Sequence, residues 1–292
     1  MILAIVGPTA VGKTKLSIEL AKLYNGEIIN CDAMQIYKGL DIGTAKATKE
    51  EMQRVPHHLL SIREVEEDYS VYDYQKDARA CIDDIKARGK IPILVGGSGL
   101  YLKAALYDYE FMDESSTVCD YHDLSLEELN TRIESFESGI VYDLKNRQRM
   151  IRILQRLESG WMPAQSDFHL LYPDVLFIGL TTDRDVLYQN INKRFDQMIV
   201  PLIDEVKPFY LKGIESKALM TGIGYKELYS FFRNEKTLVE VVEECKKASR
   251  NYAKRQYTWF QNQMDISWFS VDYIDFSKTI QEVVQYIENQ SL

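Results

Sequence analysis

Cysteine is scarce in this sequence, with four residues among 292, at positions 31, 81, 119 and 245. No two of them form a C-x-x-C pair or another metal-binding spacing, which argues against a structural zinc site. A disulfide framework is equally unexpected, so the pattern favours a reducing compartment. Long apolar runs are also missing, because no stretch approaches the roughly 20 residues of a membrane-spanning helix. The apolar N-terminal run leads directly into a glycine-rich loop, so we expect no signal peptide, no membrane contact and a cytoplasmic location.

Positive charge is in deficit, since 35 lysines and arginines face 44 aspartates and glutamates, for a formal net charge of −9. Such a sum argues against a general affinity for nucleic acid, although binding depends on a local patch and not on the total. The length suits one large core, with or without an insertion. Nothing in the sequence indicates an obligate dimer, and we expect a monomer.

A phosphate-binding loop begins close to the N-terminus. It follows the apolar run 2–6 and precedes a helical pattern, which is the setting that the G-x-x-x-x-G-K-[ST] motif requires. Its glycines let backbone N–H groups surround an anion, its lysine adds positive charge, and the hydroxyl of its last residue suits Mg²⁺. The motif predicts a diphosphate or triphosphate site. Its residues are Gly7, Pro8, Thr9, Ala10, Val11, Gly12, Lys13 and Thr14.

Polar residues follow two further predicted strands at the same sheet edge. Asp32 ends the strand predicted over 27–32, where ligands of open parallel sheets bind. Its carboxylate could bind Mg²⁺, act as a general base, hold a substrate hydroxyl or simply cap a helix. Gln35 lies in the loop that follows and could read a nucleobase edge or lie at the surface. The strand 91–95 opens into a second glycine-rich turn, in which Ser98 could donate a hydrogen bond into the same cleft.

The order of elements predicts an α/β fold. Apolar strands alternate with helical patterns, as in a P-loop NTPase-like parallel sheet flanked by helices. From residue 108 the pattern changes to an acidic, turn-like segment followed by helical patterns near 125–138 and 145–159, with no strand signal before 174. We therefore predict a core formed by residues 1–107 and 173–292 and an inserted helical subdomain at 108–172.

Basic residues gather on two predicted helices of this acidic chain. The stretch 145–156 contains five basic residues and no acid. Solvated helix faces usually mix charge signs, so contact with a polyanion is favoured over a plain surface role. A second basic cluster lies within the helix predicted over 237–262, where interleaved aromatic residues such as Tyr252 and Trp259 could stack bases or belong to the core.

Three functions are compatible with these features. The phosphate loop alone favours an ATP-dependent small-molecule or nucleoside kinase. No other apolar strand ends in an acid placed as a second Mg²⁺ ligand, however, so Asp32 could serve as the base of a transfer in which diphosphate leaves. A phosphate-loop RNA-binding protein without chemistry is the third possibility. Arg194, on the helix after the strand 174–180, could clamp a diphosphate or lie on the helix surface.

A resemblance to a known family bears on this choice. The phosphate loop and several other motifs resemble those of the tRNA dimethylallyltransferases (IPP transferases), in family order along nearly the whole chain. These other motifs are residues 32–39, 41–46, 56–59, 96–101, 194–198, 222–227 and 252–260. The resemblance implies transfer of a dimethylallyl group from dimethylallyl diphosphate to N6 of adenosine 37, in tRNAs reading codons that begin with U.

The resemblance also implies a role for each part. The phosphate loop would hold the donor's diphosphate, with Thr9 near the bridging oxygen, Arg194 as a second clamp and Mg²⁺ as the cofactor. Asp32 would take the proton from the adenine amine, after that base has flipped out of the tRNA anticodon stem-loop. The implied tRNA contacts are Asp32, Ala33, Met34, Gln35, Ser98, Gln148, Arg149, Met150, Ile151 and Arg152.

One segment departs from the family pattern. The segment 113–130 is shorter and more acidic than its counterpart in the family. It lacks the arginine that contacts tRNA in the family. Lys145, Arg147 or the C-terminal basic helix could replace it.

Overall fold

The computed structural model describes residues 1–109, 111, 121, 123–140, 142–158, 160 and 169–290. The chain divides into two compact units. The core unit comprises Met1–Tyr107 and Leu171–Leu292, and the insertion unit comprises Asp108–Leu170.

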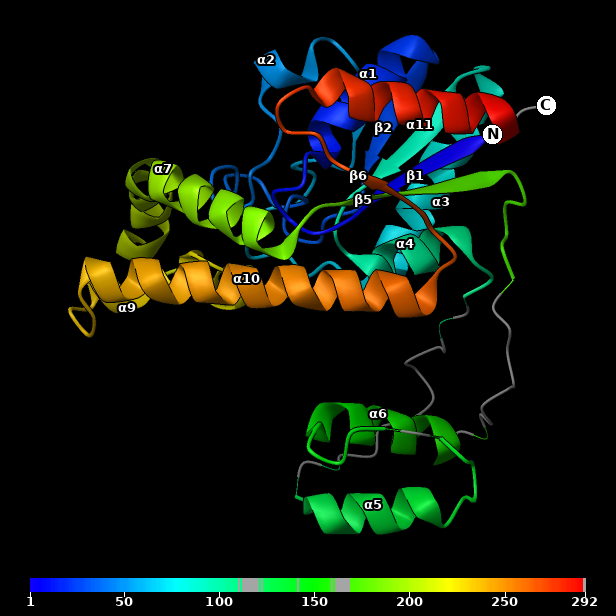
Figure 1. Ribbon diagram of the computed structural model, residues 1–292. Helices are drawn as coiled ribbons and strands as arrows, with labels where there is room; N and C mark the ends of the chain where they lie inside the picture. The colour runs from blue at the N-terminus through cyan, green and yellow to red at the C-terminus, as the bar shows by residue number, and fades with distance from the viewer. Residues whose placement is uncertain are drawn as a thin grey trace. The chain divides into compact units, whose positions relative to one another are not determined.

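A parallel sheet forms the centre of the core unit (Figure 1). Its strands, in the described part of the chain, are β1 (Ile2–Val6), β2 (Gly26–Asn30), β3 (His57–His58), β4 (Ile91–Val95), β5 (Val175–Thr181) and β6 (Ser267–Ser270). They lie in the order β3-β2-β4-β1-β5-β6, and every neighbouring pair is parallel. The predicted α/β fold is confirmed. Because β1, β2 and β4 run the same way, the residues after each of them meet at one edge of the sheet.

Helices cover both faces of this sheet, as a parallel arrangement requires. One face packs against α3 (Val71–Ala87), α4 (Gly99–Leu106) and the C-terminal half of α10 (Leu238–Gln263). The other packs against α1 (Lys13–Leu23), the first turns of α7 (Arg184–Leu211) and α11 (Phe276–Gln290). All five residues of β1 are buried, which explains why this strand reads as a continuous apolar run.

A third apolar cluster lies beyond the sheet. It joins α7, α8 (Lys217–Thr221), α9 (Tyr225–Phe232) and the N-terminal half of α10, and it includes Leu40 and Val65 from loops. The loop between β2 and β3, which contains the short helix α2 (Lys49–Met52), therefore rests on these helices. The two long helices α7 and α10 connect this cluster with the sheet.

The insertion unit contains two helices, α5 (Leu126–Glu134) and α6 (Arg147–Glu158). Each ends within a few residues of its predicted range. They share an apolar cluster of buried side chains that includes Leu129, Ile133, Met150 and Leu154. Most of the acidic segment 113–122 lies outside the described residues.

The sequence did not predict α4, and its burial explains why. Tyr101, Leu102 and the three residues from Ala104 to Leu106 are all buried, so the segment is apolar around most of its circumference and shows no amphipathic period. The helix predicted over 237–262 corresponds to α10, which begins and ends within one residue of those limits. Within the described residues, no helix combines the length and the apolar character that crossing a membrane demands.

Candidate active site

The phosphate loop adopts a conformation that depends on positive φ angles. Gly7, Ala10 and Gly12 have φ angles of 140°, 66° and 103°. A Cβ atom on Gly7 would lie 2.6 Å from the carbonyl oxygen of Leu180, so only glycine fits there. The loop leads directly into α1, whose N-terminus adds the free N–H groups and the dipole that favour an anion.

The ammonium group of Lys13 lies across this loop. Its Nζ donates to the carbonyl oxygens of Gly7 at 2.9 Å and Pro8 at 2.7 Å. Burial lowers the pKa of Lys13 to about 8, against the nearby charge of Asp32, which raises it, and with a smaller lowering from Arg194. A bound anion would stabilise the charged form of this lysine.

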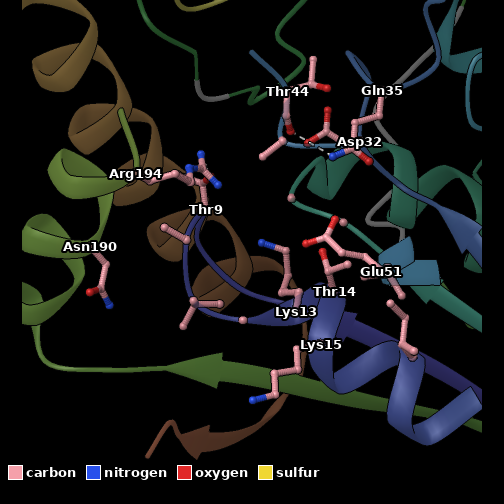
Figure 2. Close-up of a pocket in the computed structure, with 18 of the residues that line it drawn as sticks. Thr9, Lys13, Thr14, Lys15, Asp32, Gln35, Thr44, Glu51, Asn190 and Arg194 are labelled. Carbon is pink, nitrogen blue, oxygen red and sulfur yellow. Dashed lines mark hydrogen bonds between the residues drawn. The ribbon is translucent and has the colours of Figure 1, made fainter. Parts of the chain in front are cut away.

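Arg194 of α7 is the second cation of the site, as Figure 2 shows. Its Nη2 donates to Oγ1 of Thr9 at 2.8 Å, which joins two residues 185 positions apart. Burial lowers the pKa of Arg194, and the charge of Asp32 opposes that shift. The structure therefore brings together Thr9, Lys13 and Arg194, the residues of the predicted diphosphate clamp.

Asp32 is held by its backbone and by one carboxylate oxygen. Its N–H donates to Oδ1 of Asn30 and its carbonyl oxygen accepts from Nδ2 of Asn30, both at 3.0 Å. Its Oδ1 accepts from the N–H of Met34 at 2.9 Å. This is a local turn contact and not a helix cap, because no helix begins within residues 31–47. Its Oδ2 has no hydrogen bond to any described residue, so this oxygen is available to accept a proton.

Some residues near Asp32 line the cavities, and others hold the backbone next to Asp32 in place. Ser98 Oγ accepts from the N–H of Ala33 at 3.1 Å, so both residues fix the backbone behind Asp32. Nε2 of Gln35 donates to the carbonyl oxygen of Thr44 at 3.0 Å. Gln35 lines the larger of two cavities and Met34 lines the smaller one.

The two cavities meet at Asp32. The larger, of about 670 Å³, is lined by residues 9–14 of the phosphate loop with Asp32, Gln35 and Arg194. The smaller, of about 240 Å³, shares Thr9, Asp32, Thr44, Arg194 and Tyr252 with it and is otherwise lined by apolar and polar side chains, Ser249 and Arg255 among the polar ones. The further lining residues of the smaller cavity include Phe195, Met198, Ile223 and Tyr225. The carboxylate thus lies between a space suited to an anion and a smaller space that offers aromatic and apolar walls together with polar side chains.

The described side chains do not form a complete metal site by themselves. The described residues contain no group of three or more His, Cys, Asp or Glu able to hold an ion. The Thr14 hydroxyl lies in the larger cavity, at the first turn of α1. Because Mg²⁺ commonly takes one or two protein oxygens together with substrate phosphates and water, this donor set fits an ion that arrives with a diphosphate.

Two buried residues that the sequence analysis did not single out support the site. Gln256 of α10 accepts from the N–H of Thr9 at 2.9 Å and donates to the carbonyl oxygen of Gly97 at 3.1 Å. Asn30 holds Asp32, as described above. Each is a polar residue inside an otherwise apolar strand or helix face, and that signal could have identified both.

The aromatic residues of α10 belong to the core and the site. Phe260 is buried, and the ring of Trp259 lies where a Cβ atom on Gly99 would be. Tyr257 packs against Trp268, with ring centroids 5.0 Å apart. Tyr252 lines both cavities. This leaves the basic residues Lys247, Lys254 and Arg255 as the exposed part of the cluster.

In the insertion unit, the predicted RNA-contacting stretch lies on α6, where some of its side chains are exposed and others are buried. The side chains of Gln148, Arg149 and Arg152 are exposed. Met150 and Ile151 are buried, at 0% and 7% exposure, in the cluster that joins α6 to α5. These two apolar side chains therefore hold the helix in place, and the polar ones are free for a partner.

The fold and this cavity define a phosphate-loop protein of the α/β class, in which a carboxylate faces an anion-binding site. The chain belongs to the IPP transferase family, whose profile matches residues 35–263.

Relatives of known name support this membership. The chain is 46% identical to a tRNA dimethylallyltransferase of Anoxybacillus flavithermus, over 99% of this chain and 96% of the relative. It is similar to the crystal structure of a tRNA isopentenylpyrophosphate transferase from Bacillus halodurans, with a TM-score of 0.78 and 40% identity over 99% and 95% of the two chains. A eukaryotic dimethylallyltransferase acting on tRNA gives a TM-score of 0.85 at 27% identity, over 99% and 78%. The predicted family is confirmed, and the kinase alternative is not favoured.

Proposed function

We propose that this protein transfers the dimethylallyl group of dimethylallyl diphosphate to N6 of adenosine 37 in tRNAs reading codons that begin with U. The products are N6-(dimethylallyl)adenosine and diphosphate. The observation that carries this proposal is the joint cavity: Asp32 faces the phosphate loop and Arg194 in a chain 46% identical to a tRNA dimethylallyltransferase.

In this reaction N6 attacks the allylic carbon, and the bond between that carbon and the bridging oxygen breaks. The electron pair leaves with the diphosphate, and the N6 proton passes to Oδ2 of Asp32. Lys13, Arg194 and the loop N–H groups stabilise the charge that develops on the leaving diphosphate. Because Thr9 Oγ1 already accepts from Arg194, its own proton is available for the bridging oxygen.

Mg²⁺ is the proposed cofactor, with Thr14 as its protein ligand. When bound, the ion would supply positive charge to the diphosphate oxygens. The phosphate loop and Arg194 would hold the leaving group, and Asp32 would face the base.

The anticodon stem-loop is the proposed part of tRNA that binds, with the adenine flipped toward Asp32. The exposed side chains of Gln148, Arg149 and Arg152 would contact its backbone, and Met34 and Gln35 would line the space for the base. We also propose that the protein acts as a monomer in the cytoplasm, consistent with the free thiols of Cys31, Cys81 and Cys245 in the described part of the chain.

The direct test is to incubate the protein with anticodon stem-loop RNA, dimethylallyl diphosphate and Mg²⁺, and to measure RNA mass. A gain of one five-carbon isoprenyl unit on the adenosine next to the anticodon is expected. An RNA with guanosine at that position is the matched control and should gain nothing. No gain on the adenosine RNA, together with ATP turnover on a small alcohol, would overturn the proposal.

The variant Asp32→Asn tests the base directly. It keeps the size of the side chain and its contact with Met34 but cannot accept the proton, so we expect transfer to fall about 10²–10⁴-fold. RNA affinity should stay within about threefold in a binding titration. Glu66→Gln, which removes an exposed carboxylate elsewhere, is the charge control. Asp32→Asn with near-normal turnover would exclude Asp32 as the base.

A further inference from the structure

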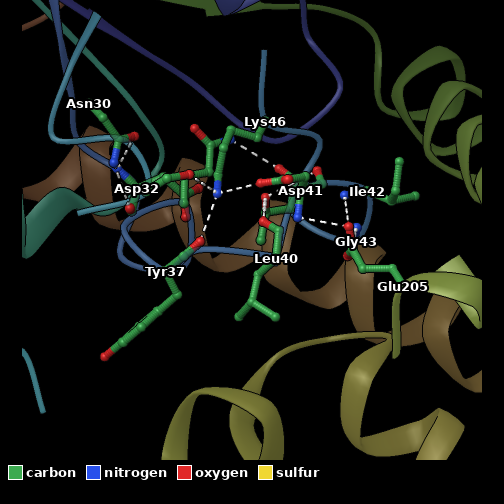
Figure 3. Close-up of polar contacts among 12 residues, drawn as sticks. Asn30, Asp32, Tyr37, Leu40, Asp41, Ile42, Gly43, Lys46 and Glu205 are labelled. Atoms are coloured by element: carbon green, nitrogen blue, oxygen red, sulfur yellow. Dashed lines mark hydrogen bonds and ion pairs between the residues drawn. The ribbon is translucent and has the colours of Figure 1, made fainter. Parts of the chain in front are cut away.

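A glutamate outside the phosphate site binds three successive backbone amides of a loop that lines the cavities (Figure 3). Oε2 of Glu205, on α7, accepts from the N–H groups of Asp41 at 2.9 Å and Ile42 at 2.6 Å. Its Oε1 accepts from the N–H of Gly43 at 3.2 Å. Three neighbouring amides that point at one group form an anion-binding concavity, and here the protein fills it with its own carboxylate.

Tyr225 completes this contact. Its hydroxyl donates to Oε1 of Glu205 at 2.6 Å, so one carboxylate accepts four hydrogen bonds. The tyrosine ring lies so close to the backbone that a Cβ atom on Gly43 would be 2.5 Å from it, and one on Gly222 would be 2.8 Å from it. The residues of α9 and α7 are thus fitted to this loop and leave no room for a larger residue at either glycine.

The other end of the loop is fixed as well. The side chain of Lys46, only 6% exposed, donates to the carbonyl oxygen of Tyr37 at 2.7 Å, to Oδ1 of Asp41 at 2.6 Å and to Oγ of Ser61 at 2.8 Å. All three donors of the ammonium group are therefore used. The segment between Asp41 and Lys46 has little freedom as long as Glu205 and Lys46 hold it.

This segment forms a wall of the active site. Thr44 lines both cavities, and its carbonyl oxygen holds the Gln35 amide at 3.0 Å. Gly43 lines the smaller cavity, as does Tyr225. A shift of the three amides would therefore move the walls against which an acceptor group must lie.

The same helix carries the opposite clamp. Arg194 and Glu205 both belong to α7, separated by 11 residues, or about 16 Å at the rise of an α-helix. Arg194 contacts the phosphate loop and Glu205 contacts the loop 41–43. One helix, with Pro201 between the two contact residues, thus connects the donor side and the acceptor side of the cavity.

We propose that Glu205 is a positioning residue for the acceptor: through the amides of residues 41–43 it holds Thr44 and Gln35 where the adenine binds. This inference rests on the proposed function. Glu205 does not touch substrate. A carboxylate suits this position because its two oxygens accept all four bonds, whereas the NH₂ group of a glutamine would face at least one backbone N–H in either orientation.

Steady-state kinetics of Glu205→Gln and Glu205→Ala, with RNA and donor varied separately, test the proposal. We expect kcat/KM for the RNA to fall about tenfold in Glu205→Gln and about a hundredfold in Glu205→Ala, while the donor KM changes less than twofold. Tyr225→Phe removes one of the four bonds, so its kcat/KM for the RNA should fall less than that of Glu205→Gln. This variant keeps the proposal testable if Glu205→Ala does not fold. Asp204→Asn removes the same charge from the next residue of α7, which is exposed, and should match the wild type.

Amide hydrogen exchange gives a readout that does not depend on activity. The amides of residues 41–43 should exchange at least tenfold faster in Glu205→Gln than in Asp204→Asn, with amides of the sheet unchanged. Unchanged exchange would overturn the anchor, and equal losses for RNA and donor would overturn the acceptor-specific role. Absence of transfer by the wild type would instead overturn the proposed function, so the two failures are distinguishable.

Discussion

Lys13 and Asp32 carry opposite charges in one cavity, but burial acts on the lysine strongly enough to bring its pKa to about 8. Diphosphate favours the charged form of the lysine, so donor binding above pH 8 must take up a proton. The donor's own last ionisation, near pH 6, is complete by then. The affinity for donor should therefore weaken as pH rises above 8, by up to tenfold per pH unit.

Titration calorimetry of dimethylallyl diphosphate between pH 7 and 9.5 checks this expectation. Lys13→Met should bind more weakly and lose the slope above pH 8, whereas Lys76→Met, at an exposed position of α3, should keep it. A wild-type Kd that stays flat across the range would contradict the role of Lys13.

Glu27 is a second buried charge, and its role is structural. At 2% exposure, it accepts from Arg88 at 2.5 and 2.8 Å, from Lys90 at 2.7 Å and contacts His58 at 2.7 Å. The Arg88 hydrogen bonds hold the pKa of Glu27 well below its usual value of 4.5, against burial, with help from Lys90 and His58. Its stabilising effect is therefore full above pH 4.5 and lost as pH falls below that value.

Glu27→Ala should lower the free energy of unfolding at pH 7 by about 1.5–3 kcal/mol, because it removes the charged hydrogen-bond acceptor shared by the partly exposed side chains of Arg88, Lys90 and His58. Urea unfolding measures this loss, and the gap from the wild type should narrow as the pH falls below 4.5. Asp84→Asn, which removes the exposed ion pair between Asp84 and Arg88, should cost less than about 1 kcal/mol. Equal losses in the two variants would show that burial of Glu27 is unimportant.

How far single residues could be predicted depends on how local their contacts are. Asp32 was predicted because the end of an apolar strand next to a phosphate loop places a side chain at the ligand edge. Glu205 was not, because its three backbone partners lie 162–164 residues away and its own helix gives no local signal. The alternative of Asp32 as a helix cap could be excluded only once the loop after β2 was seen to contain no helix at that point.

Among the elements, α10 connects the phosphate loop to the turn after β4 through Gln256. This side chain could not be replaced by a shorter one without freeing the N–H of Thr9, so Gln256→Ala should raise the donor KM about tenfold. RNA affinity should change little, because Gln256 is buried at 5% exposure. Steady-state kinetics with varied donor check this, with Asn251→Ala, exposed on the same helix, as the control. A rise in the RNA KM alone would contradict the role assigned to Gln256.

Helices with one apolar face could be predicted from sequence, and a buried one could not. The apolar spacing of α3 follows a helical period because only one side of it meets the sheet. In α4 the period vanishes, since the sheet, α3 and α10 surround it. The role of α7 as a connection between two walls of the cavity also depends on tertiary contacts, which no local pattern encodes.

At the scale of the whole molecule, the net charge of −9 does not indicate which surface would bind RNA. If α6 contacts RNA, each phosphate contact contributes a fixed increment to the salt dependence of binding. Arg149→Ala and Arg152→Ala should each weaken affinity for the anticodon stem-loop and reduce the slope of log K against log salt by about 1.

Binding titrations at several salt concentrations measure both effects. Arg132→Ala removes an exposed arginine from α5, the other helix of the insertion unit, and is the matched control that should leave the slope unchanged. If all three variants reduced the slope equally, the contact would be diffuse and not specific to α6.

Backbone hydrogen bonds join the residues at the start of the insertion to those at its end. Leu171 N donates to the carbonyl oxygen of Leu106 at 2.8 Å, and Asp108 N donates to that of His169 at 3.0 Å. A short turn from Tyr107 to Leu171 would therefore close the core without displacing either end, and each strand pairing described lies outside residues 108–170. The insertion could therefore be gained, lost or replaced as one segment. A change in the length or charge of residues 108–170 should leave the strand pairings of the core unchanged.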